Sequence, residues 1–122
     1  MAKRILIVDD DEMVLIALKE LLLPEGYEVH TVSGGSEALE KLDQDDYDLL
    51  MLDIIMTEMD GFDFCREARR DPKLRNTPFI FYTANYLDPK DAKLARRLGA
   101  DRFVVKPQEM PELLRVINEV LD

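Results

Sequence analysis

Four short apolar runs of this 122-residue chain are each followed directly by a polar side chain that could take part in chemistry. Asp9 and Asp10 follow the first run of the chain, Asp53 the third, Thr83 the fourth and Lys106 the fifth. Carboxylate oxygens are the ligands that Mg²⁺ or Mn²⁺ prefers, and a carboxylate is also a nucleophile that can form a covalent phosphoryl intermediate. A metal ion and a lysine would neutralise the transferring oxygens, so the set suits phosphoryl transfer if the fold brings its members together.

The apolar runs alternate with amphipathic segments along the whole chain. In the first amphipathic segment, apolar residues recur at i, i+3, i+4, i+7 and i+8 from Val14 to Leu22, which indicates one face of a helix. Continuous apolar strands that alternate with helices predict an α/β fold with a parallel sheet covered on both faces. The strands are expected at residues 5–8, 27–32, 49–52, 79–82 and 103–105, the second of them alternating like an edge strand.

Proline, glycine and serine predict several helix boundaries. Pro24 and Gly26 should end the first helix, and Ser33 should cap the second. Pro89 suits the first position of the fourth helix, and Gly99 should end it.

The carboxyl ends of parallel strands lie at one edge of a sheet, where such folds bind ligands. Asp9, Asp10, Asp53, Thr83 and Lys106 should therefore converge although they are far apart in sequence. Three carboxylates, one lysine and one divalent cation would together make a neutral site. Each residue alone also has an ordinary explanation, such as an acidic helix start or a solvated surface charge. The placement of all five at one edge of the sheet favours a functional site.

Composition narrows the class of protein and its partners. The formal net charge is -10 and the pI about 4.5, which disfavours binding to DNA, RNA or anionic membranes. The single cysteine, Cys65, cannot form an internal disulfide and falls in an apolar helical pattern, so we expect a buried thiol. The first apolar run is too short for a signal peptide or a membrane span, which predicts a cytoplasmic domain.

Several short blocks of residues occur in this order along the chain: Ile5-Leu6-Ile7-Val8-Asp9-Asp10, Leu52-Asp53, Met56, Met59-Asp60-Gly61, Thr83-Ala84, Leu98-Gly99-Ala100-Asp101 and Lys106-Pro107. With these blocks, the sequence resembles the receiver (CheY-like) domain of two-component response regulators over essentially its whole length. The resemblance implies a flavodoxin-like, doubly wound (βα)₅ fold with strand order 2-1-3-4-5. The length of the chain predicts one domain over residues 1–122, with no effector domain expected in this chain.

The resemblance assigns the acidic residues to phosphoryl and metal chemistry. Asp53 matches the family's phosphoacceptor, which takes its phosphoryl group from a histidine kinase or a histidine phosphotransfer protein. Asp10 and Asp53 match direct ligands of Mg²⁺, with Mn²⁺ as an alternative. The backbone carbonyl of Ile55 is implied as a third ligand, and Asp9 would act mainly through water.

The remaining matches concern phosphoryl binding and switching. Lys106 matches the lysine that contacts the phosphoryl oxygens, and the family's Lys-Pro bond implies a cis peptide between Lys106 and Pro107. Thr83 and the Ala84 amide match groups that bind the phosphoryl group. Phe103 matches the aromatic residue that turns inward when the threonine moves.

These assignments predict a signalling switch and not a turnover enzyme. Phosphorylation would remodel the face formed by the fourth helix, fifth strand and fifth helix, which would then bind a downstream protein effector. A phosphorylation-dependent dimer is also compatible with the resemblance.

Two positions depart from the usual family pattern, and two more lie where the family varies its rate of dephosphorylation. Thr57 replaces a common proline, and Phe103 lacks the hydroxyl of the commoner tyrosine. Ile55 and Asn85 occupy positions at which the family tunes dephosphorylation. Our hypothesis is that the apolar Ile55 hinders the attacking water and prolongs the phosphorylated state.

Three other functions are alternatives to the switch. A pseudo-receiver that no longer uses phosphate conflicts with the intact set of acidic, hydroxyl and lysine residues. A Mg²⁺-dependent phosphatase would usually need a second acid two residues after the nucleophile, where this chain has Ile55. A nucleotide-binding domain is weaker still, because residues 33–36 do not form either common phosphate-binding glycine motif.

Overall fold

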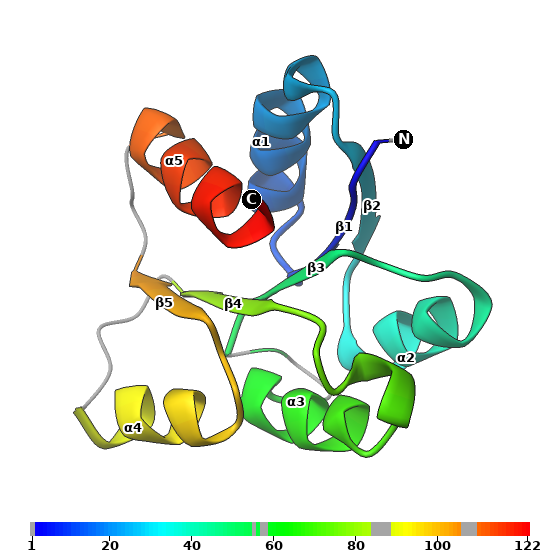
Figure 1. Ribbon diagram of the computed structural model, residues 1–122, viewed down its shortest axis with the longest axis vertical. Coiled ribbons are helices and arrows are strands. Elements are labelled where there is room, and N and C mark those ends of the chain that lie inside the picture. Colours follow the sequence, from blue (N-terminus) through cyan, green and yellow to red (C-terminus); the bar gives the residue numbers. More distant parts are fainter. Residues whose placement is uncertain (1, 55, 57–58, 84–88, 106–109) are drawn as a thin grey trace.

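The computed structural model describes residues 2–54, 56, 59–83, 89–105 and 110–122, which form alternating strands and helices (Figure 1). None of the helices in these ranges is long and apolar enough to cross a membrane. The strands are β1 (Arg4–Val8), β2 (Glu28–Val32), β3 (Leu49–Leu52), β4 (Phe79–Thr83) and β5 (Arg102–Val105). The helices are α1 (Glu12–Leu22), α2 (Gly35–Gln44), α3 (Gly61–Arg69), α4 (Pro89–Arg97) and α5 (Met110–Leu121), with 3₁₀ turns η1 (Leu23–Glu25) and η2 (Pro72–Leu74).

The strands form one parallel sheet in the order β2-β1-β3-β4-β5, which confirms the predicted fold and order. Strand β2 is an edge strand, as its alternating sequence predicted. Strand β1 lies between β2 and β3, so that Val8 is level with Val32 on one side and with Leu52 on the other. The register therefore brings the ends of β1 and β3 to the same edge of the sheet.

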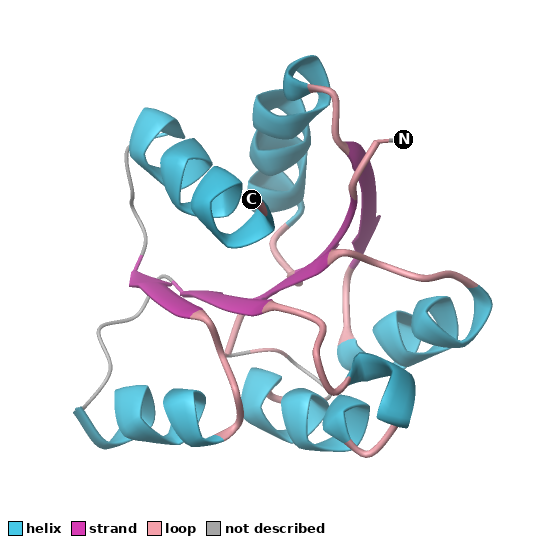
Figure 2. Cartoon of the chain, in the orientation of Figure 1, coloured by secondary structure: helices cyan, strands magenta, loops and turns pink. Residues whose placement is uncertain are grey.

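Figure 2 shows helices on both sides of the sheet. Two hydrophobic cores lie on the opposite faces of the sheet, each between the strands and one layer of helices. Helices α1 and α5 cover one face, and α2, α3 and α4 cover the other (Figure 1). Side chains of a strand alternate between its faces, so Leu6 and Val8 join one core while Ile5 and Ile7 join the other. All four are at most 1% exposed, which explains why the strand sequences are apolar without interruption.

Most of the predicted helix boundaries are confirmed, and one is wrong. Gly26 and Gly99 have φ of 90° and 88°, a left-handed conformation that glycine adopts without strain, and Pro89 begins α4. Ser33 is not the cap of α2, because the helix begins at Gly35 with Gly34 at the capping position. The Ser33 hydroxyl instead donates a hydrogen bond to the Glu37 carboxylate, at 3.0 Å.

Cys65 is the buried thiol that the sequence predicted. It is 0% exposed on the inner face of α3 and forms no disulfide. Its sulfur lies 3.5 Å from the Leu98 carbonyl oxygen. Burial raises the pKa of the Cys65 thiol to about 11, so the thiol is protonated and has little nucleophilic character at neutral pH.

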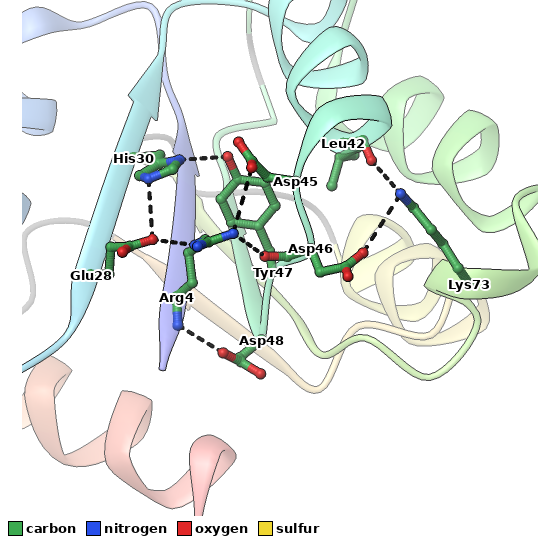
Figure 3. Close-up of polar contacts among 9 residues, drawn as sticks. All are labelled: Arg4, Glu28, His30, Leu42, Asp45, Asp46, Tyr47, Asp48 and Lys73. Atoms are coloured by element: carbon green, nitrogen blue, oxygen red, sulfur yellow. Dashed lines mark hydrogen bonds and ion pairs between the residues drawn. The ribbon is translucent and has the colours of Figure 1, made fainter. Parts of the chain in front are cut away.

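A polar network joins the starting ends of β1, β2 and β3, at the edge of the sheet opposite Asp53 (Figure 3). The Arg4 guanidinium pairs with Glu28, and the Arg4 backbone N–H donates to the Asp48 carboxylate at 2.7 Å. The ring of His30 lies between Glu28, at 3.3 Å from Nε2, and the Tyr47 hydroxyl, at 2.6 Å from Nδ1. These contacts hold the three strands in register at the edge of the sheet that lies away from the predicted site residues.

Arg69, in the last turn of α3, joins three parts of the chain that are separate in sequence. Its guanidinium lies over the Phe79 ring, 4.0 Å from the ring centre, and donates hydrogen bonds to backbone carbonyls. These carbonyls, at 2.6–3.4 Å, belong to Leu74, Arg75, Thr77, Leu98 and Gly99.

We expect Arg69→Met to lower the free energy of unfolding by about 2–3 kcal/mol, because several partly buried carbonyls lose a charged donor. The matched control is Arg70→Met, whose side chain is 77% exposed and forms an ion pair with Glu67 alone among the described residues. The control should change stability by no more than about 0.5 kcal/mol. Urea unfolding followed by circular dichroism measures both values; equal losses for the two variants would contradict the role given to Arg69.

Candidate functional site

Three carboxylates meet at the carboxyl edge of the sheet. Asp9 and Asp10 follow β1, and Asp53 follows the neighbouring strand β3. Their carboxylate oxygens include three, one from each residue, that all lie within 4.8 Å of one another. Among the described residues, this is the only group of three or more acidic, histidine or cysteine side chains close enough to hold a metal ion.

Backbone hydrogen bonds to the last residues of the strands hold two of these acids in place. The Asp53 N–H donates to the Val8 carbonyl at 3.0 Å, and the Asp9 N–H donates to the Val32 carbonyl at 3.2 Å. Both bonds extend the strand pairing by one residue beyond β1 and β3. The acids therefore sit on the rigid sheet and not on a free loop.

Burial makes the repulsion among the three carboxylates costly. Asp9 is 2% exposed and Asp53 is 9% exposed, whereas Asp10 is exposed to solvent. Like charges at this separation, away from bulk water, favour the binding of a compensating cation. A cluster of hard oxygen ligands with one side open to water suits a divalent metal ion that keeps some of its water.

Backbone N–H groups stabilise the acids from within the chain as well. The Ile54 N–H donates to the Asp53 carboxylate at 2.8 Å, and the Asp11 N–H donates to the Asp9 carboxylate at 2.9 Å. Asp11 itself caps α1 through the Met13 N–H. Helix α1 thus begins beside the cluster, with the positive end of its dipole at the edge where the carboxylates lie.

The other predicted site residues fall mostly outside the described residues. These are Ile55, Ala84, Lys106 and Pro107, and with them Thr57 and Asn85 and the predicted cis peptide. Thr83 is described through its backbone alone: it ends β4, two residues beyond Phe81, which is level with Leu52. Its position at the same edge as Asp53 agrees with the expected convergence.

Phe103 lies on the edge strand β5, level with Phe81 of β4. Its side chain is half-buried and packs against the core beneath α2, α3 and α4. The structure thus places the predicted switch aromatic at the margin of a core.

Sequence reasoning missed the part that Gly61 plays in positioning Asp53. The Gly61 N–H donates to the Ile54 carbonyl at 2.8 Å, and α3 starts directly against the strand end. A Cβ atom at Gly61 would lie 2.4 Å from the Asp53 carbonyl oxygen and 3.0 Å from the Ile54 Cα. The signal in the sequence was the glycine at a helix start eight residues after Asp53, since close backbone approach requires that residue.

Comparison with known proteins now identifies the family. The sequence model of the response regulator receiver domain family matches residues 5–118 of this chain. The chain belongs to the response regulator receiver domain family. Receiver domains are phosphoacceptor signalling modules that work with histidine kinases, and they are not enzymes with turnover.

Individual similarities agree with this family. The chain is 39% identical over 117 residues to the response regulator SaeR of Staphylococcus aureus, covering 96% of this chain and 50% of SaeR. The chain spans about half the length of the curated relatives it matches.

Solved structures show the same fold. The chemotaxis protein CheY4 of Vibrio cholerae is 30% identical with a TM-score of 0.93, and the match covers 99% of this chain and 100% of CheY4. The response regulator TrrA of Thermotoga maritima, solved in complex with Mg²⁺-BeF, is 37% identical with a TM-score of 0.84; the match covers 98% of this chain and 99% of TrrA.

We expect Gly61→Ala to lower the free energy of unfolding of this receiver domain by about 2–3 kcal/mol, because the added methyl group meets backbone atoms that cannot move aside. It should also shift the NMR signals of the Asp53 and Ile54 amides. Gly26→Ala is the control: its φ is unfavourable for alanine, at a cost of about 1 kcal/mol, but nothing lies within 4 Å of the new Cβ atom. Unchanged Asp53 and Ile54 signals in Gly61→Ala would show that the close approach does not position the acid.

Proposed function

We propose that this receiver domain accepts a phosphoryl group on Asp53 from the phosphohistidine of a histidine kinase or a histidine phosphotransfer protein. The observation that carries the proposal is the group of three carboxylates within 4.8 Å, one of them at the end of the buried strand β3. An Asp53 oxygen would form the new bond to phosphorus while the bond from phosphorus to the imidazole nitrogen breaks. The electron pair of that bond returns to the imidazole.

The low exposure of Asp53, at 9%, supports its role as the nucleophile. A carboxylate that has lost most of its hydration shell needs less desolvation before it reacts. Asp10 is exposed and faces solvent, so it is better suited to holding a hydrated cation than to attacking phosphorus. Asp9 is buried and its carboxylate already accepts the Asp11 N–H, which suits an indirect role through water.

The metal ion of this proposal is Mg²⁺, with Mn²⁺ as an alternative. Asp10 and Asp53 would bind it directly, together with the Ile55 carbonyl oxygen, since hard oxygen donors prefer such ions to zinc. When bound, the ion would offset the carboxylate repulsion and neutralise charge on the transferring oxygens. The Mg²⁺-BeF complex of the similar TrrA supports this assignment.

Lys106, Thr83 and the Ala84 amide would bind the transferred phosphoryl group. Lys106 would balance negative charge on the phosphoryl oxygens, and the Thr83 hydroxyl would move toward them. Phe103 is half-buried on the edge strand, and in this proposal its ring would turn inward as the threonine moves. The surface of α4, β5 and α5 would then change and bind a downstream protein effector, or a second phosphorylated copy.

Phosphorylation can be tested directly on the purified chain. Incubation with Mg²⁺ and acetyl phosphate should add one phosphate, seen by intact-protein mass spectrometry, that is absent from Asp53→Asn and from a sample with EDTA. A missing adduct in the native sequence would favour the pseudo-receiver. Rapid multiple turnover of acetyl phosphate would favour a phosphatase.

The lifetime of the phosphoryl group tests the hypothesis about Ile55. We expect Ile55→Asn to speed its loss roughly three- to tenfold, because a polar side chain can orient the water that the apolar one hinders. Ile55→Val keeps the apolar character and serves as the control. Loss from Ile55→Asn at the native rate, or more slowly, would reject the hypothesis.

A further inference from the structure

The segment between β3 and α3 contains a methionine whose side chain is partly open to solvent. Met59 is half-buried and follows Asp53 by six residues, two residues before α3 begins. Its side chain packs against the core beneath α2, α3 and α4. Oxygen-atom donors such as hydrogen peroxide convert a methionine thioether to a polar sulfoxide, which disrupts apolar packing. The position of Met59 therefore combines access for an oxidant with a contact that oxidation can break.

Met59 lies along Gly35, the first residue of α2, and fills the space that a side chain would occupy there. A Cβ atom at Gly35 would lie 3.1 Å from the Met59 sulfur, 3.3 Å from its Cβ and 3.5 Å from its Cγ. Gly35 is itself buried. Most of the Met59 side chain thus rests on the backbone of α2, which covers the same face of the sheet as α3 (Figure 1).

The residues that follow Met59 hold the backbone of Asp53. Asp60 caps α3 through its carboxylate, and the Gly61 N–H donates to the Ile54 carbonyl at 2.8 Å. Gly61 also lies so close to the Asp53 carbonyl oxygen that no Cβ atom fits between them. Met59 therefore anchors on α2 the short segment that supports the proposed phosphoacceptor from one side.

The other described sulfur-bearing side chains lack this combination of exposure and packing. Met51 and Met56 are 1% and 9% exposed, so they are shielded from an oxidant in solution. Burial raises the pKa of the Cys65 thiol to about 11, and a protonated, buried thiol reacts poorly with peroxide. Met13 is 72% exposed on α1, where a sulfoxide adds polarity to a side chain that water already surrounds. Among these residues, oxidation that also disturbs packing near Asp53 is thus confined to Met59.

We propose that Met59 is an oxidation site through which hydrogen peroxide slows the phosphorylation of Asp53. A lone pair of the thioether sulfur attacks one peroxide oxygen, and the oxygen–oxygen bond breaks. The sulfur gives up two electrons and keeps this oxygen as a sulfoxide. The other oxygen leaves as hydroxide and takes the proton from the transferred oxygen, so that the second product is water. The sulfoxide is larger and more polar than the thioether and no longer packs against Gly35 and the apolar core.

Loss of this contact releases the segment before α3 from α2. Asp60 and Gly61 then support the Asp53 backbone less firmly, and phosphoryl transfer slows because its rate depends on the placement of the nucleophile. Reduction of the sulfoxide by a methionine sulfoxide reductase restores the thioether, so the effect is reversible. The inference rests on the proposed function in its last step alone, since neither the oxidation nor the loss of packing requires phosphate.

Peroxide treatment of the purified chain tests the site. Peptide mapping by mass spectrometry should find sulfoxide at Met13 and Met59 before it appears at Met51 or Met56. Phosphorylation by acetyl phosphate and Mg²⁺ is then followed by intact-protein mass spectrometry. We expect its rate to fall about threefold or more as Met59 is oxidised, because the nucleophile is less well placed. Methionine sulfoxide reductases should restore the rate.

Substitutions separate Met59 from the other targets of peroxide. Met59→Leu keeps the apolar character and nearly the volume, so it should accept phosphate at a rate close to the native one and lose the sensitivity to peroxide. Met59→Gln resembles the sulfoxide in length and polarity and should be slow without any oxidant. Met13→Leu is the matched control and should stay as sensitive as the native chain. Circular dichroism melting checks that each variant is folded.

Gly35→Ala tests the contact without a change in sulfur chemistry. The added methyl group meets the sulfur and the Cβ of Met59, so the Met59 side chain must move. We expect the NMR amide signals of Asp53 and Gly61 to shift in this variant and also on oxidation of the native chain. Gly26→Ala is the control and should leave these signals in place, because nothing lies within 4 Å of its new Cβ atom.

The outcomes separate this inference from the proposed function. The inference is overturned if Met59 resists peroxide that oxidises Met13, if oxidation of Met59 leaves the phosphorylation rate unchanged, or if Met59→Leu remains sensitive. Each of these results can occur while the untreated chain accepts phosphate normally. Conversely, an untreated chain that accepts no phosphate rejects the proposed function. The amide signals of Asp53 and Gly61 then still decide whether oxidation of Met59 loosens the site.

Discussion

The placement of three mutually repelling carboxylates on adjacent strand ends is the constraint on which this structure depends. Asp9, Asp10 and Asp53 would separate if they lay on flexible loops, because their charges repel. They stay together because the sheet continues past β1 and β3 through the backbone bonds that the Asp9 and Asp53 N–H groups donate to Val32 and Val8. The free energy of forming the sheet thus offsets the repulsion at its edge, and a bound cation would relieve what is left.

The two covered faces of the sheet make that arrangement rigid. Strand β1 is central and its apolar side chains are almost fully buried on both sides, so it cannot shift by a residue without moving the whole set to the wrong face. The polar contacts of Arg4 and His30 hold the starting ends of the strands, and the close approach of Gly61 holds the carboxyl edge from the other side. The pairing of the strands at their starting ends therefore determines the positions of the carboxylates at their carboxyl ends.

The same architecture places the acidic cluster and the surface proposed for partner binding in different parts of the molecule. The acidic cluster lies at the ends of β1 and β3, while a hollow lined by Arg96, Arg102 and Phe103 lies between α4 and the start of β5. Strand β4 stands between them, and its last residue, Thr83, is at the acidic edge. Phe103, level with Phe81 of β4, belongs to the hollow. In the proposed switch, a change that begins at Asp53 would pass through β4 to reach that surface.

The sequence by itself determined the order of strands and helices and the identity of the acidic residues. Those features depend on local patterns, such as the apolar runs that end before Asp9 and Asp53 and the glycines, Gly26 and Gly99, that end helices. Such patterns can be read without knowledge of the fold. The cap of α2 was predicted wrongly at Ser33, since a serine near a helix start can bond to a side chain such as Glu37 as readily as to the backbone. Only the tertiary structure decided that Gly61 lies against Asp53, that Arg69 joins α3 to the turn after α4, and that Arg96 and Arg102 face one hollow. Each of these contacts joins residues whose distance depends on how whole elements pack, and no local pattern records that distance.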